Sequence, residues 1–92
     1  MSTTDKIKQA ITITENELTF EINTLKECAQ NLIMHAKQGE YLITDIDSGN
    51  GYYSGFFGFA EDNIKKAIKA EDRINSLRTT LLKLKYALNE ND

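Results

Sequence analysis

Apolar and small residues recur along this chain at alternating intervals of three and four, in two long series separated by a glycine-rich segment. The first series is Leu18, Ile22, Leu25, Ala29, Leu32, Ala36, Gly39, Ile43 and Ile46. The second is Ala60, Asn63, Ala67, Ala70, Ile74, Leu77, Leu81, Leu84 and Leu88. This spacing is typical of the seam along which one helix packs against another. It therefore predicts two long α-helices.

The two series mirror each other about Tyr53. When the chain folds back there, every pair across the seam has position numbers that add up to 106, as for Leu25 with Leu81. In the same register Leu32 lies opposite Ile74, and Asn63 is the one polar residue in the seam. The pattern predicts an all-α fold: a long antiparallel helical hairpin that resembles a coiled coil.

Capping and turn-forming residues predict the limits of the helices. Residues 2–5 are good N-cap types, which favours a short helix over about 4–11. The β-branched residues at 12–14 and a capping box of Thr14 with Glu17 predict a break and then a long helix over about 15–47. The glycines and aromatic residues of 48–57 predict the turn, and a second long helix follows over about 58–89. Residues 1–92 then form a single domain.

Two alternatives with β-strands remain open at this stage. Residues 11–13 and 18–22 alternate with period two and could pair as a β-hairpin. Residues 41–46 and 52–57 could do the same around the Asp-Ser-Gly-Asn-Gly segment at 47–51. The seam runs through the first pair of segments and favours helix there. For 41–57 the sequence leaves a loop, a helix end or short strands open.

The hairpin seam leaves large apolar residues unused on both helices. Ile13, Phe20, Met34 and Tyr41 share one heptad column, which Glu27 interrupts. The second helix carries another set off its seam: Ile64, Ile68, Leu82 and Tyr86. A chain of 92 residues buries little surface alone. We therefore expect a homo-oligomeric helical bundle, with Phe20, Met34 and Tyr41 at its interface.

Charge is unevenly divided between the two arms. The formal net charge is −3, but residues 1–59 carry eight acids against four lysines, whereas residues 60–88 carry seven bases against four acids. Because the whole chain is acidic, duplex nucleic acid is an unfavoured partner. A small anionic ligand such as a nucleotide fits better. In this alternative Lys66, Arg73 and Arg78 supply charge at a subunit interface, and Tyr52 or Tyr53 stacks on the ligand.

The residues that could carry chemistry do not assemble into a catalytic or metal-binding motif. The segment 45–51 fails as a calcium loop because Phe56 stands where the bidentate glutamate belongs. His35 and Cys28, the single histidine and cysteine, cannot build a zinc site alone. No nucleophile pairs with a base, so the sequence predicts a protein that is not an enzyme and needs no cofactor or metal.

The sequence thus favours a protein–protein interaction module: an adaptor, an assembly factor or an inhibitor. Phe56 and Phe57, in the aromatic tip, are expected to anchor a partner. One cysteine, no apolar signal core and no run of about 18 apolar residues predict a cytoplasmic protein that does not bind membranes. In a virus this would be the host cytoplasm, and the small size also suits a phage-type counter-defence protein.

Overall fold

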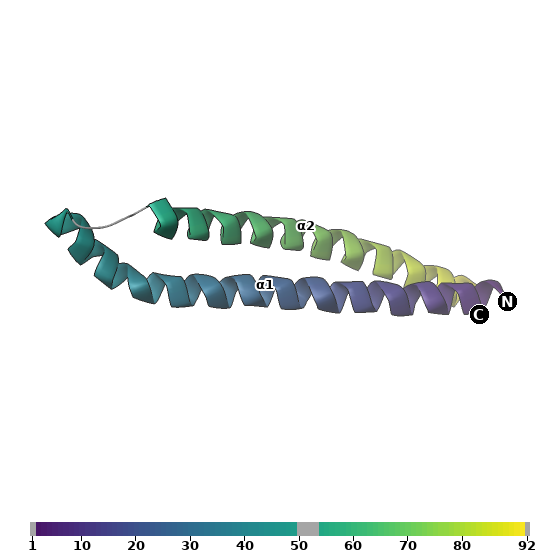
Figure 1. Cartoon of the computed structure of the whole chain (residues 1–92). Coiled ribbons are helices and arrows are strands. Elements are labelled where there is room, and N and C mark those ends of the chain that lie inside the picture. Colours follow the sequence, from purple (N-terminus) through teal and green to yellow (C-terminus); the bar gives the residue numbers. More distant parts are fainter. Residues whose placement is uncertain (1, 50–53, 92) are drawn as a thin grey trace.

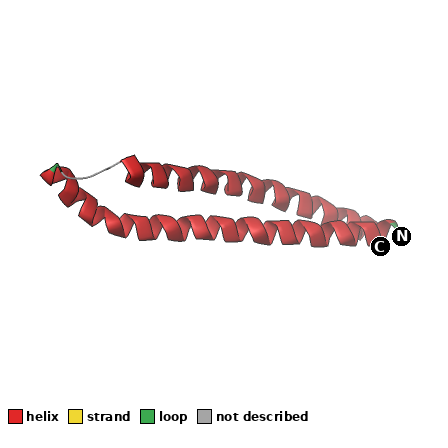
Figure 2. Ribbon diagram, viewed as in Figure 1, coloured by secondary structure: helices red, strands yellow, loops and turns green. Residues whose placement is uncertain are grey.

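Two long helices account for nearly all of the structure, a computed structural model that describes residues 2–49 and 54–91. Helix α1 spans Thr3–Ser48 and helix α2 spans Ser54–Asn91. They run antiparallel, so that the N- and C-termini meet at one end, called here the base (Figure 1). The other end is called the tip. The predicted all-α hairpin is therefore confirmed, and Figure 2 shows helix along both arms.

The hairpin is a thin rod measuring 69 × 17 × 15 Å. At 1.5 Å per residue the 46 residues of α1 rise about 69 Å, so this helix alone spans the molecule. The core is correspondingly a single line of contacts between two helices. Its most buried apolar side chains are Cys28, Ala70, Ile74 and Leu77.

Local sequence sets both ends of α1. The hydroxyl of Ser2 accepts a hydrogen bond from the Asp5 amide at 3.1 Å, and Asp5 places its charge in the first turn, where the helix dipole favours an acid. At the other end Gly49 adopts a left-handed conformation with φ 73°, and its amide donates to the carbonyls of Asp45 and Ile46. Glycine suits this position because it has no Cβ to clash.

The predicted break at 12–14 is wrong, and so is the separate helix over 4–11, because α1 continues through these residues. The hydroxyls of Thr12 and Thr14 donate to the carbonyls of Lys8 and Ala10, at 3.2 and 2.7 Å. These bonds satisfy the threonine side chains inside the helix. The propensity cost of β-branched residues is only tenths of a kcal/mol each, which packing against α2 outweighs. For the same reason the strand alternative at 11–13 and 18–22 is wrong.

The tip is shorter than predicted. Helix α1 runs through residues 41–46 to Ser48, so these residues form no strand, and α2 begins at Ser54 rather than at 58. Phe56 and Phe57 therefore lie in the first turn of a helix rather than in a loop. Tyr52 and Tyr53, predicted as stacking residues, lie outside the described residues.

The predicted register of the hairpin is wrong. The Asn31 side-chain amide donates to the side-chain oxygen of Asn63 at 3.3 Å, and a Cβ on Gly39 would lie 3.5 Å from the Phe56 ring. The position numbers of these pairs add up to 94 and 95 rather than 106. Relative to the prediction, α2 is thus displaced along α1 by about 11 residues, or roughly 16 Å. Leu25 does not lie opposite Leu81, nor Leu32 opposite Ile74.

The predicted seam is correct on α2 but partly wrong on α1. All predicted seam residues of α2 are buried or half-buried. On α1 the column of Leu18, Leu25, Leu32 and Gly39 is also correct, whereas Ile46, which continues it, is exposed. The second column of the α1 seam is one residue off. This column is Ile22, Ala29, Ala36 and Ile43, called here the alanine column. Ile22 is half-buried, but beyond it α2 covers Cys28 and His35 in place of Ala29 and Ala36. Ala29, Ala36 and Ile43 are exposed.

The register leaves the end of α1 uncovered. Figure 1 shows the last turns of α1 reaching past the start of α2. Tyr41, Ile43 and Ile46 are 76%, 64% and 47% exposed there. The apolar surface of this overhang is available to a partner.

Gly39 offers a direct test of the tip packing. An added Cβ would lie 3.5 Å from the Phe56 ring, which is an ordinary van der Waals distance. Gly39→Ala should therefore stabilise the hairpin by about 0.5–1 kcal/mol through helix propensity. Gly49→Ala is the matched control, and it should destabilise by about 1 kcal/mol because φ is 73° there. Urea unfolding followed by circular dichroism measures both. Destabilisation by Gly39→Ala would contradict this packing.

Candidate functional site

An aromatic cluster joins the two helices near the tip. The His35 ring of α1 stacks on Phe56 of α2 with ring centroids 4.0 Å apart, and Phe59 lies tilted against it at 4.5 Å. His35 Nε2 lies 2.7 Å from the Phe56 carbonyl oxygen. Because a carbonyl only accepts, Nε2 carries the proton and donates it. His35 is thus held by packing and by a hydrogen bond, which makes it a structural link between the helices.

A pocket of about 520 Å³ opens beside this cluster. His35, Phe56 and Phe59 form part of its lining, with Met34 and Tyr41 on α1. This volume falls in the range of small-molecule sites. The lining is shared between the helices, so the pocket depends on the register that the hairpin adopts.

The basic residues predicted to hold an anion are only partly brought together. Arg73 reaches across the seam to Glu21 at 3.5 Å and Glu17 at 3.8 Å, so its charge is already balanced within the hairpin. Lys66, seven residues earlier, lies on the same side of α2. Arg78 lies about 120–140° around the helix axis from these two. With the tyrosines outside the described residues, anion capture stays a prediction.

The residues predicted for protein contacts are largely exposed. Phe20, Met34 and Phe57 are 68%, 64% and 57% exposed, as is Tyr41 in the α1 overhang. Phe20 and Met34 lie on the flank of the hairpin that also carries the Arg73 ion pairs and the pocket. Phe56 differs from Phe57: it is half-buried against His35 and Gly39.

The opposite flank carries an apolar surface whose residues the sequence analysis named but did not place together. In an antiparallel pair the alanine column of α1 and the equivalent column of α2 lie on the same side of the seam. We call this surface the tip face, and it comprises Ala29, Ile33, Ala36 and Ile43 of α1 with Phe57, Ile64 and Ile68 of α2, all of them exposed. The sequence pattern does indicate this surface, because α1 has apolar columns on both sides of its leucines. Two such columns are typical of a helix that packs against two partners.

Among the described residues, no three or more His, Cys, Asp or Glu side chains are grouped so that they could hold a metal ion. Neither described helix contains a stretch apolar enough to span a membrane. Comparison with protein-family models, curated proteins and solved structures gave no match for this chain.

Phe56 and Phe57 should respond differently to truncation, because one ring joins the helices and the other faces solvent. Phe56→Ala should cost about 1–3 kcal/mol of stability by removing the contacts with His35 and Gly39. Phe57→Ala should change stability by less than about 0.5 kcal/mol. Thermal unfolding of both variants, at one protein concentration below the onset of self-association, makes the comparison. Equal losses would contradict the described tip.

Proposed function

We propose that the protein is a non-enzymatic protein–protein interaction module that works as a homo-oligomeric helical bundle. In this role it serves as an adaptor, an assembly factor or an inhibitor. Its surface, rather than a catalytic cavity, is the functional element.

The observation that carries the proposal is the excess of exposed over buried apolar side chains. Within the described residues the buried apolar set is Cys28, Ala70, Ile74 and Leu77, whereas thirteen large apolar side chains are exposed. They follow both flanks of the rod and the α1 overhang, rather than being scattered singly. Extended apolar surfaces on proteins of this size are typical of interfaces. A lone two-helix hairpin also gains little from its core, so association supplies stability that one copy lacks.

The side chains that are most often found in active or binding sites support the same proposal. Cys28 is 2% exposed, so its thiol is shielded from solvent and acts as a small apolar residue. His35 is engaged by two phenylalanine rings and a carbonyl. Arg73 is engaged by two glutamates. These groups are used to hold the helices together.

Sedimentation equilibrium tests the oligomer. We expect the mass at micromolar concentration to be a multiple of the 10.4 kDa chain, with the unfolding temperature falling on dilution as the bundle dissociates. A fully helical species of 10.4 kDa at every concentration would contradict the proposal. Calorimetric titration with linear and cyclic nucleotides is the companion experiment. No heat is expected, whereas saturable binding would replace the interaction module with the anion-binding alternative.

A further inference from the structure

The tip face brings apolar side chains of both helices together along the tip half of the hairpin, with Glu40, seven residues after Ile33 on α1, as a charged position among them. Its α1 members follow the leucine column on the side away from the Arg73 ion pairs, and its α2 members Phe57, Ile64 and Ile68 are 57%, 49% and 56% exposed. Ala29 and Ala36 are small, which permits another helix to approach closely. The opposite flank, in contrast, places Phe20 among Asn16, Glu17 and Arg73.

We propose that the tip face binds the tip face of a second copy of this chain, with both tips pointing the same way, to form an antiparallel four-helix bundle. This inference rests on the proposed oligomer and names its contact surface. In this arrangement a two-fold axis runs along the rod. Each α1 then lies over the α2 of its partner, and every helix has antiparallel neighbours.

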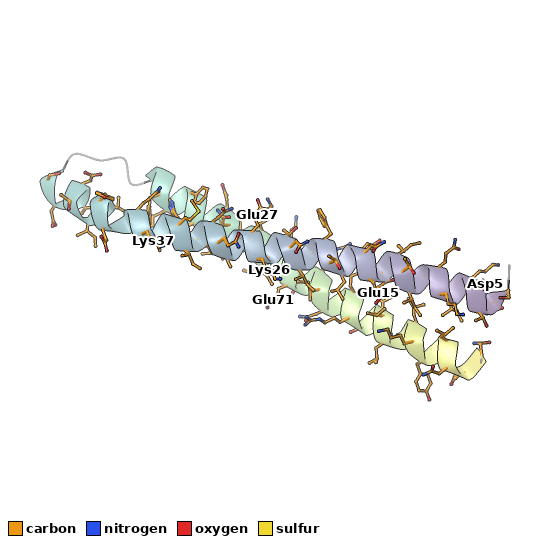
Figure 3. All side chains as sticks on the ribbon, turned by 90° about the horizontal axis from the view of Figure 1, so that it is seen from below. Asp5, Glu15, Lys26, Glu27, Lys37 and Glu71 are labelled. Carbon is orange, nitrogen blue, oxygen red and sulfur yellow. The ribbon has the colours of Figure 1, made fainter. Side chains whose placement is uncertain are left out.

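Charge complementarity supports a second copy in this orientation. The bases Lys66 and Arg73 of α2 lie on the opposite flank, so the charges that meet a second copy here are those at the rim of the tip face. At the rim of the tip face, Lys26 of α1 and Glu71 of α2 stand at nearly the same level along the rod (Figure 3). The two-fold axis places the Lys26 of each copy near the Glu71 of the other. The reverse orientation would stack acidic α1 on acidic α1.

The available area also fits a dimer. Half of the 69 Å length multiplied by the 17 Å width gives a footprint of roughly 600 Å² on each copy, or about 1,200 Å² in total. This value is the lower limit of specific protein interfaces. Towards the base the same flank carries Lys8, Glu15, Arg78 and Lys85, so the apolar contact is confined to the tip half.

Paired glutamates test the assignment. Ile33→Glu with Ile64→Glu introduces two charges into the tip face, and should weaken self-association about 100-fold or more. Phe20→Glu with Met34→Glu introduces the same charge at the interface that the sequence predicts, on the opposite flank and at sites of similar exposure, so this pair tests the rival surface. If the tip face is the contact, association stays within about threefold of the wild type. Sedimentation equilibrium measures the association, and circular dichroism at high concentration confirms that each variant remains helical.

The outcomes separate the two proposals. Loss of the dimer in the tip-face pair alone supports the inference. Loss in the Phe20 and Met34 pair alone overturns the tip face but leaves the oligomer standing, whereas a monomeric wild type overturns both. A spin label on Lys83, near the base, then tests orientation: labels in the two copies should lie about 20–30 Å apart. A separation of about 60 Å would show tips overlapping from opposite directions, and would overturn the proposed orientation.

Discussion

The structure depends on polar groups that must be satisfied inside a helix–helix seam. Asn63 is 8% exposed, and its side chain donates to the Phe59 carbonyl at 3.0 Å while accepting from Asn31 across the seam. Burying an amide without partners costs more than one apolar contact returns. A single buried asparagine is accordingly an effective determinant of register in helical pairs. The displacement of α2, the overhang of α1 and the choice of seam column all follow from the register that this contact selects.

The same register determines which residues of α1 Arg73 contacts, and which residues of α2 His35 contacts. With position numbers adding to 106, Arg73 would approach His35, and Asn63 would face the apolar Ile43. In the structure Arg73 instead meets Glu17 and Glu21, and His35 meets Phe56 and Phe59. Exposed ion pairs contribute little stability individually. Their contribution here is to disfavour the register that adds to 106, in which Arg73 would be separated from Glu17 and Glu21.

The sequence predicted the coarse fold well and the register poorly, for a physical reason. Heptad spacing reports which side of a helix is apolar, and it identified all of the α2 seam. Helix α1 has two apolar sides that share its leucines, so spacing alone could not tell which side α2 covers. The hydrophobicity of the positions favoured the alanine column as the one that packs against α2. In the structure α2 instead covers Glu21, Cys28 and His35, and Ala29 and Ala36 are exposed. The tip face arises for the same reason, because its residues Ala29, Ala36 and Ile43 are positions that the sequence analysis had assigned to the contact with α2.

The register is therefore the central claim, and a paired distance measurement tests it most directly. Spin labels are placed on exposed positions, Asn23 with Asp72 in one protein and Asn23 with Lys83 in another, with Cys28 replaced by alanine. Dilution with unlabelled chain removes distances between copies. Positions 23 and 72 are level in the structure, whereas 23 and 83 are level in the register that adds to 106. The account predicts that the distance from 23 to 72 is the shorter, the other pair being offset by about 16 Å along the rod. A shorter distance from 23 to 83 would contradict it.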